Sequence, residues 1–270
     1  MKHSLRFLGA AALMLLLASC GNDDPVDTAT VHLDRLISHV NLANGQTRIG
    51  NAEATLAIDF VASTVDLLAY NGITEAPIEF IGIPAGFYDR GHGTFAKRDG
   101  NNDISGWYDT PMKLGAIFYI NSAAVGNAPR NTILHSQRLL TKIVINEYSF
   151  STDYSEEQTA RYYDLRMNVD EGKATGTLLI HNIQFAPEMP ILQYIRIPLE
   201  ELEVTHEGYT KTIDTLTPYF ASGSIETPMP ERQIENFVLN VDLHTGKFKI
   251  AFDCYGLHFT EELDLYGIWE

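Results

Sequence analysis

Aromatic and charged side chains gather in one glycine-rich stretch of the chain, residues 83 to 112. Flat rings beside hydrogen-bonding groups suit a sugar or another amphipathic ligand, because the apolar face of the ligand stacks on a ring while its hydroxyls are held. The alternative is that the rings cap one end of a sheet and leave the charged groups in water. The candidate ligand-binding residues are Phe87, Tyr88, Arg90, His92, Trp107 and Tyr108, with Asp109 beside them.

Cys20 is the second residue with distinctive chemistry. It follows a basic start and an uncharged apolar block of 12 residues, from residue 7 to residue 18. A block this short predicts a secretory signal peptide, because a helix that spans a bilayer needs about 20 residues. We therefore exclude residues 1–19 from the fold and expect residues 20–30 to form a flexible, acidic tether.

The residues around Cys20, Leu17-Ala18-Ser19-Cys20, resemble the lipobox of bacterial lipoproteins. The resemblance implies cleavage before Cys20 and a lipid on its sulfur, which is the only strong nucleophile in that stretch once it is ionised. Two or three acyl chains hold a protein firmly on a membrane, whereas one is marginal. The alternative is a conventional leader that contains a cysteine by chance.

Catalytic signatures are missing from the sequence. It contains no GxSxG, HExxH, GxGxxG or phosphate-binding GxxxxGK[ST] motif and no Cys/His pair with zinc spacing. Asp99 to Asp103 carries oxygen ligands at alternate positions but lacks the other features of a calcium loop, so a polar turn is expected. His206 and His244 fall at predicted turns. We predict no catalytic residue, no metal and no cofactor, which favours a role other than catalysis.

The charge of the chain excludes one class of partner. It has 19 Lys and Arg against 35 Asp and Glu, a formal net charge of −16, and no basic cluster. Phosphate backbones and anionic headgroups repel such a chain, so we expect no nucleic-acid partner and a membrane contact that comes from the lipid alone. The other cysteine, Cys254, is in phase with apolar residues and is predicted to be a buried structural thiol.

Apolar residues alternate with polar ones over most of the chain, which predicts an all-β fold with little helix. The clearest pattern is a three-stranded meander from Phe237 to Leu265, in which Glu261 takes an inward position and predicts a bulge. Hairpins are expected at Asn44-Gly45, at residues 170–173 and at residues 206–208. We expect antiparallel meander sheets that close into a barrel or a barrel-like sandwich. The strands divide into an N-terminal β region (31–150) and a C-terminal β region (151–270), as one barrel or two packed units.

Two segments do not alternate, residues 83–112 and residues 217–232. Both are rich in Gly, Pro and polar residues and predict long loops, which often carry binding function. The segment "TVHLDRLISHV" carries a weak helix signal, but its β-branched residues favour a strand, so both remain open.

The C-terminal half is similar to lipoproteins of the Bacteroidetes type that carry a calycin-like (lipocalin-like) β-barrel domain. The similarity rests on Phe185-Ala186 with Met189-Pro190, and on Phe252-Asp253-Cys254-Tyr255-Gly256, and covers about residues 160–266. It implies a barrel that holds a small apolar ligand. Asn22-Asp23-Asp24 is similar to the acidic run that is thought to send such lipoproteins to the outer face of the outer membrane.

The sequence thus favours a lipid-anchored, surface-exposed protein of the outer membrane that binds a small molecule or glycan without catalysis, in a barrel mouth or under residues 83–112. Two alternatives remain. One is a structural or interaction subunit of a surface assembly that works through a protein partner. The other is a hydrolase that uses two dispersed carboxylates, as glycosidases do.

Overall fold

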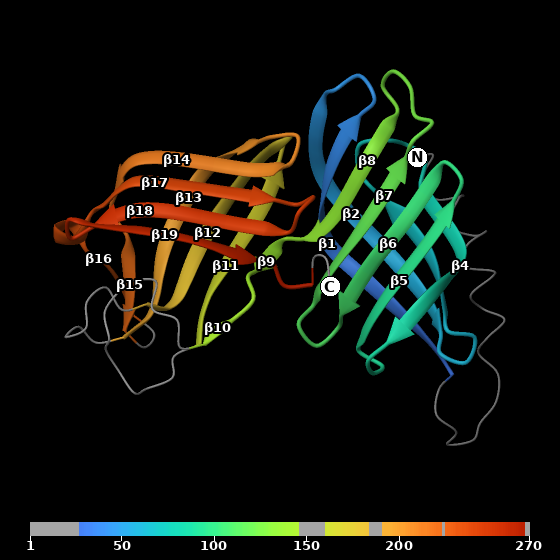
Figure 1. Cartoon of the computed structure of the whole chain (residues 1–270), viewed down its shortest axis with the longest axis horizontal. Helices are drawn as coiled ribbons and strands as arrows, with labels where there is room; N and C mark the ends of the chain where they lie inside the picture. The colour runs from blue at the N-terminus through green and yellow to red at the C-terminus, as the bar shows by residue number, and fades with distance from the viewer. Residues whose placement is uncertain (1–26, 146–159, 184–190, 223–224, 268–270) are drawn as a thin grey trace, which may run out of the picture.

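The computed structural model describes residues 27–145, 160–183, 191–222 and 225–267, which form two antiparallel β units side by side (Figure 1). The prediction of an all-β fold is confirmed. The first unit, here the barrel, is an eight-stranded closed barrel in which β8 pairs with β1. Its strands are β1 (Thr28–Leu42), β2 (Thr47–Asp59), β3 (Thr64–Tyr70), β4 (Ile78–Phe87), β5 (His92–Asp99), β6 (Asn102–Asp109), β7 (Leu114–Asn121) and β8 (Pro129–Ser136).

Side chains fill the interior of the barrel. Successive side chains of a strand point to opposite sides of the barrel wall. The inward residues include Leu36, Leu56, Ile83 and Tyr108, each at most 1% exposed. A closed eight-stranded antiparallel barrel is the fold that a calycin-like domain has, but it lies in residues 28–136, whereas the resemblance covered residues 160–266. Eight strands give an interior just wide enough for side chains to fill it, as they do here.

The second unit, here the curled sheet, begins before the predicted C-terminal region. Its elements are β9 (Arg138–Leu140), β10 (Val144–Ile145), β11 (Ala160–Asp170), β12 (Lys173–Ile183), β13 (Leu192–Val204), β14 (Gly208–Leu216), β15 (Tyr219–Ser222), β16 (Ile225–Pro228), the 3₁₀ helix η2 (Pro230–Arg232), β17 (Ile234–Asp242), β18 (Lys247–Cys254) and β19 (Leu257–Asp264). Its two edges meet at a single bridge between Thr141 and Leu265. Two backbone hydrogen bonds flank that bridge, Lys142 to Asp264 at 2.8 Å and Tyr266 to Leu140 at 2.7 Å.

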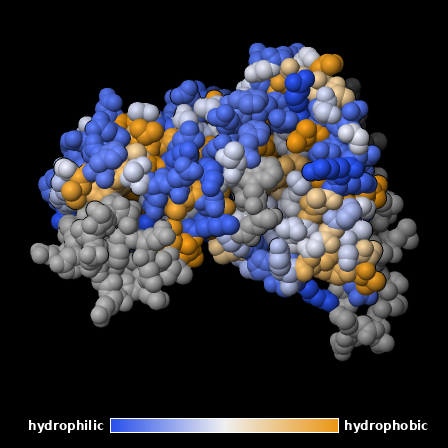
Figure 2. Space-filling view, in the orientation of Figure 1, coloured by the Kyte–Doolittle hydropathy of each residue, from blue (hydrophilic) through white to orange (hydrophobic). Residues whose placement is uncertain are grey.

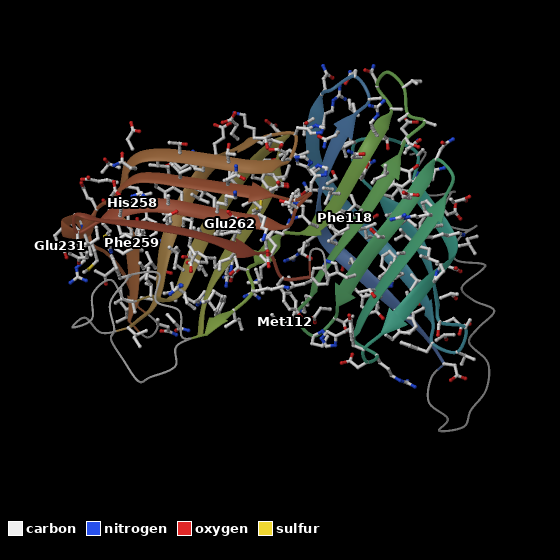
Figure 3. All side chains as sticks on the ribbon, viewed as in Figure 1. Met112, Phe118, Glu231, His258, Phe259 and Glu262 are labelled. Atoms are coloured by element: carbon white, nitrogen blue, oxygen red, sulfur yellow. The ribbon has the colours of Figure 1, made fainter. Side chains whose placement is uncertain are left out.

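The predicted C-terminal meander is confirmed as β17, β18 and β19, but the bulge at Glu261 is wrong. The register from Lys247–Asp264 to Cys254–Leu257 is continuous. Phe259, labelled in Figure 3, is buried at 2% exposure, and Glu261, two residues further along β19, lies on the same side of the strand. There its carboxylate pairs with the guanidinium of Arg161 and accepts a hydrogen bond from the hydroxyl of Tyr163. A charge therefore stands at an inward position without distorting the strand.

The prediction of two long loops is also wrong. Residues 83–112 contain the end of β4 and all of β5 and β6, and residues 217–232 contain β15, β16 and η2. Asp99 and Asn102 pair across the tight β5–β6 turn. The ambiguous segment near the start of the barrel is a strand, β1, and β1 begins inside the predicted tether, at Thr28.

The two units share a buried interface. On the outer wall of the barrel, Ile37, His39 and His135 are fully buried against the curled sheet. The ring of His39 hydrogen-bonds through Nε2 to the carbonyl of Thr205 at 2.8 Å, and His135 Nε2 meets the hydroxyl of Tyr209 at 2.8 Å. The units are thus joined by apolar packing that encloses two imidazoles.

Cys254 faces the core of the curled sheet, at 2% exposure, which confirms the prediction of a buried thiol. Burial raises its pKa to about 11. The thiol is therefore protonated at neutral pH and is a poor nucleophile. The predicted signal peptide, Cys20 and Asn22-Asp23-Asp24 all lie outside the described residues. Within the described ranges, no helix has the length and apolar character needed to cross a bilayer.

Candidate functional site

A groove of about 810 Å³ runs along the outer wall of the barrel. β4, β5 and β6 form most of it, and two residues that follow β19, Tyr266 and Gly267, form one side. The curled sheet thus completes a site on the barrel. β5 and β6 cross the front of the barrel in Figure 1, and the lower part of this face carries many pale and orange residues in Figure 2.

Small side chains make the floor of the groove. Alternation along β5 and β6 turns Thr94, Ala96 and Ser105 outward into the groove. Their inward neighbours fit tightly, because Phe95 packs where a Cβ on Gly106 would stand, with 2.4 Å between that Cβ and the ring. Gly106 is therefore needed for the barrel core, and the small outward side chains leave the outer face open.

Aromatic rings make the walls. The rings of Trp107 and Tyr266 meet edge to face, with centroids 5.8 Å apart at 88°. Gly267, with a φ of 72°, lies over the Trp107 ring, and a Cβ there would stand 2.4 Å from it. Tyr88 is 77% exposed at the end of β4. An exposed large aromatic in a groove is a surface on which a ligand can stack.

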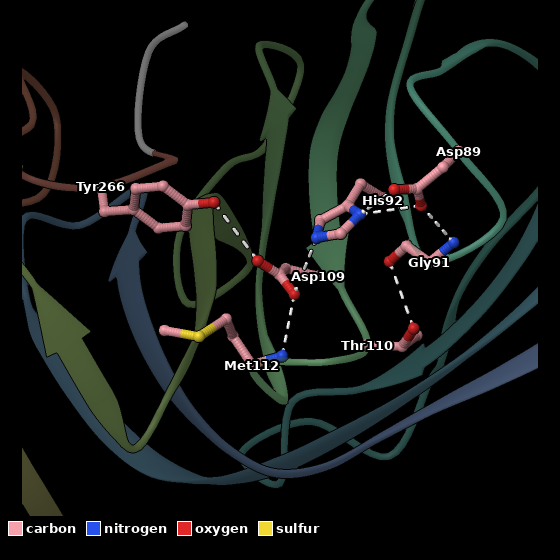
Figure 4. Close-up of polar contacts among 7 residues, drawn as sticks. All are labelled: Asp89, Gly91, His92, Asp109, Thr110, Met112 and Tyr266. Atoms are coloured by element: carbon pink, nitrogen blue, oxygen red, sulfur yellow. Dashed lines mark hydrogen bonds and ion pairs between the residues drawn. The ribbon is translucent and has the colours of Figure 1, made fainter.

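A chain of four polar side chains links these walls (Figure 4). His92 Nδ1 lies 2.7 Å from the carboxylate of Asp89, and its Nε2 lies 3.2 Å from Asp109 Oδ1. The hydroxyl of Tyr266 donates to Asp109 Oδ2 at 3.2 Å, and the Met112 amide donates to Oδ1 at 2.8 Å. The chain ties the turn before β5 to the end of β6 and to the curled sheet.

The two carboxylates around His92 favour its charged form. The hydrogen bond to Asp89 is the main cause that raises the pKa of His92, and the same bond lowers the pKa of Asp89. Both ring nitrogens already face carboxylates, so His92 has no nitrogen left to act as a general base toward a ligand. Its role in this geometry is to hold the groove in shape.

A pH dependence follows for this region of the barrel. The pKa of His92 is above its ordinary value of 6.5, so the link is complete below pH 6.5 and is lost as the pH rises through the raised value. We expect hydrogen-exchange protection factors at residues 88–92 to fall between pH 6 and pH 9. His92→Gln should remove this change, and His32→Gln, at another exposed histidine of the barrel, should keep it. Equal protection factors at both pH values in the wild type would contradict the assignment.

The structure brings four of the six predicted ligand-binding residues to the groove. Tyr88, His92, Trp107 and Tyr108 line it, although the ring of Tyr108 is buried on the inner side of the barrel wall. Burial raises the pKa of the Tyr108 hydroxyl to about 12. The other two residues lie elsewhere.

Phe87 and Arg90 form a separate contact with Phe60. Phe87 points toward the barrel core, and its ring centroid lies 4.9 Å from that of Phe60. The guanidinium of Arg90 lies 5.6 Å from the centroid of the same Phe60 ring. Neither residue lines the groove.

Three residues of the groove, Phe118, Tyr266 and Gly267, lie outside the segment 83–112 in which the sequence placed the site, and within that segment the floor residues Thr94, Ala96 and Ser105 were not predicted. Phe118 lies on β7, and the sequence pattern of that strand does not predict whether Phe118 contacts the barrel core or the curled sheet. Tyr266 and Gly267 are more than 150 positions from Trp107 and reach it only because the curled sheet docks on the barrel. The local sequence carries no signal for either contact.

Within the described parts of the chain, no group of three or more His, Cys, Asp or Glu side chains is arranged to hold a metal ion. The groove itself is lined by one carboxylate, Asp109, and by no Lys or Arg among the described residues. Its rings can stack on a ligand and its polar groups can hydrogen-bond to one, which is typical of a binding site. Comparison of the chain with known protein families, with curated proteins and with solved structures gave no match.

Proposed function

We propose that this protein is a lipid-anchored surface lipoprotein of the Bacteroidetes type, and that its groove binds a small amphipathic molecule or glycan without catalysis. The observation that carries the proposal is the groove itself, where exposed rings stand beside a floor of small residues, two of which carry hydroxyl groups. The packed interior of the barrel favours this outer site over a barrel mouth. The anchor rests on the lipobox-like sequence at Cys20 and on the acidic residues after it.

The first test concerns the anchor. Cys20→Ala is expected to move the protein from the membrane fraction to the soluble fraction and to abolish incorporation of labelled palmitate, because the thioether cannot form without the thiol. Cys254→Ala serves as the matched control, since Cys254 is buried in the curled sheet and should not affect the label. Full membrane retention of the Cys20→Ala protein would contradict lipid anchoring.

The second test concerns the groove. Tyr88→Ala should reduce ligand capture from growth-medium and host extracts at least tenfold, because an aromatic side chain that anchors a ligand contributes about 1.4 kcal/mol or more to binding. Tyr88 is 77% exposed, so its removal should change the free energy of unfolding by only about 0.5 kcal/mol. Capture is measured by mass spectrometry of small molecules that co-purify with the immobilised full chain.

Tyr70→Ala is the control for this change, because Tyr70 is a 42% exposed tyrosine of β3 that does not line the groove. It should capture as the wild type does. Equal capture by the wild type and the Tyr88→Ala protein would exclude the groove as the binding site. A deletion of residues 87–108 is not suitable as a test, since it would remove all of β5 and most of β6 and open the barrel.

One observation supports the interaction subunit as a second candidate. The ladder between β4 and β5 has only three pairs, and that between β13 and β14 has only two. Strand edges are thus open beside each ladder, and lysines reach across both gaps: Lys97 donates to the carbonyl of Ile81 at 3.0 Å, and Lys211 to that of Glu201 at 2.5 Å. Lysine at an open edge is a known guard against strand addition, so binding in the groove remains the better-supported function.

The hydrolase alternative finds less support at this site. Glycosidases place two carboxyl groups on either side of the bond that they break. Asp109 is the one carboxylate among the described residues that line the groove, and it already accepts hydrogen bonds from Met112 and Tyr266. An acid and a base at the required separation are therefore missing from the described lining.

A further inference from the structure

We propose that the ligand of the groove is an uncharged glycan, rather than an acidic glycan, a lipid acid or a purely apolar molecule. This inference rests on the proposed binding role of the groove and narrows it to one chemical class. Three features of the groove support it: its charge, its hydroxyl groups without partners, and its exposed rings.

The charge of the groove disfavours an anion. Among the described residues that line it, the only cation is His92, and Asp89 and Asp109 already engage both of its ring nitrogens. A carboxylate or sulfate in the groove would face Asp109 with no free cation among the described lining, in a chain of net charge −16. Like charges brought together during binding are a common source of discrimination against a wrong partner.

The hydroxyl groups disfavour a purely apolar ligand. The side-chain hydroxyls of Tyr88, Thr94 and Ser105 make no hydrogen bond within the described part of the structure. Each can both donate and accept, as each hydroxyl of a sugar can. A hydrocarbon that covered them would remove water and leave them unpaired, which weakens binding.

Asp109 adds a fixed acceptor at the end of this floor. Its carboxylate receives the Met112 amide, the Tyr266 hydroxyl and His92. An ionised carboxylate has about four acceptor positions, so about one is left, and a ligand hydroxyl reaches it only through the 3% of this side chain that is exposed. The three existing contacts hold the group still, which lowers the entropy lost when a ligand binds.

The rings supply the apolar part of the recognition. Tyr88 is 77% exposed and Tyr266 is 37% exposed, so ring surface in the groove is open to a ligand. A pyranose has one face of C–H groups and a rim of hydroxyls, which matches rings that stand beside hydroxyls and a carboxylate. The groove is open along the barrel wall, and an open groove admits a chain of sugar units rather than a single enclosed molecule.

The test is a calorimetric titration of the full chain carrying Cys20→Ala with hexasaccharides of two kinds. The uncharged probes are maltohexaose, cellohexaose, xylohexaose and mannohexaose, and the acidic probes are hexagalacturonate and a hyaluronan hexasaccharide; laurate is the lipid acid. We expect at least one uncharged probe to bind, at least tenfold weaker binding by the acidic probes and laurate, and loss of binding in Tyr88→Ala.

A charge variant sharpens the test. Ser105→Lys places a cation on the floor of the groove and should shift the preference toward the acidic probes by at least tenfold. Ile120→Lys adds the same charge to β7 of the barrel outside the groove, where Ile120 is 44% exposed, and should leave the preference unchanged. An equal shift in both variants would mean that the net charge of the chain, and not the groove, sets the selectivity.

The outcomes separate the two proposals. Tighter binding of an acidic probe or of laurate, lost in Tyr88→Ala, would overturn the uncharged-glycan inference and keep the groove as the binding site. The inference also fails, and the groove again stands, if no probe binds while capture from extracts still depends on Tyr88. If neither the probes nor capture from extracts depend on Tyr88, both the inference and the proposed function are wrong.

Discussion

Lowering the pH below 6.5 is expected to reduce the free energy of unfolding by up to about 2.7 kcal/mol per pH unit, because two buried imidazoles take up protons only when the interface between the units opens. Burial lowers the pKa of His39 and that of His135 to about 4 each. Both are then neutral in the folded protein, while the unfolded chain binds two protons near their ordinary value of 6.5. The loss should be steepest between about pH 6 and pH 4.

The partners of the two rings explain why protonation is unfavourable. His135 Nδ1 donates to the carbonyl of Ser136 at 2.9 Å, which leaves Nε2 to accept from the Tyr209 hydroxyl. His39 Nε2 donates to the carbonyl of Thr205, and its Nδ1 is buried with no partner in the described residues. A second proton on either ring would place a charge in a buried interface with no carboxylate partner among the described residues, and His206 and His244 further disfavour the charge on His39.

The measurement is urea unfolding of the full chain at a series of pH values. The double variant His39→Gln, His135→Gln should lose most of the slope between pH 6.5 and pH 4.5, even if it is less stable at pH 7. His258→Gln is the control, since the side chain of His258 is 65% exposed and should leave the slope unchanged. A double variant with the wild-type slope would show that other groups cause the acid sensitivity.

Glu261→Gln should destabilise the protein by about 3 kcal/mol, because it removes the negative charge that faces the Arg161 guanidinium in a largely buried ion pair. The side chains of Arg161 and Glu261 are 8% and 12% exposed. The pair and the Tyr163 hydroxyl join β11 to β19, across the line where the two edges of the curled sheet meet at a single bridge. The variant therefore weakens the closure of the whole unit.

Glu262→Gln is the matched control for this prediction. Glu262 is the next residue on β19 and points to solvent (Figure 3), where it pairs with Lys249 at 3.0 Å. Exposed pairs contribute at most about 1 kcal/mol, so this variant should be close to the wild type. The double variant Arg161→Met, Glu261→Met should recover most of the loss, because two apolar groups leave no buried charge. Equal effects of Glu261→Gln and Glu262→Gln in urea unfolding would contradict the inward placement of Glu261.

The sequence was sufficient for the hairpins in which alternation and turn residues agree. The β17–β18–β19 meander and the β1–β2 turn at Asn44-Gly45 are found where they were predicted. The sequence did not predict β5 and β6, because Gly93 and Gly106 stand at inward positions, where the alternating pattern of a strand would have a larger apolar residue. They are glycine because Tyr108 and Phe95 occupy the space that their side chains would fill. The small and large residues pack across the strands, and single-strand patterns do not show this.

The sequence did not predict the interface between the units, for a related reason. β1 carries a nearly continuous buried run from Leu36 to Leu42, since its inner side faces the barrel core and its outer side faces the curled sheet. A run without alternation does not distinguish a strand buried on both faces from a helix. The sequence likewise did not predict the contact of Tyr266 with Asp109 in the groove, because this contact depends on how the two units dock.

Chemical-shift mapping with the ligand that the wild-type chain captures is the most direct test of binding in the groove. We predict that the backbone amide signals of Gly86, Thr94, Ala96 and Ser105 shift on titration, and that these shifts disappear in Tyr88→Ala while Tyr70→Ala keeps them. Shifts confined to barrel-core residues such as Leu56 and Ile83, or to the gap between β13 and β14, with unchanged groove signals, would contradict the account.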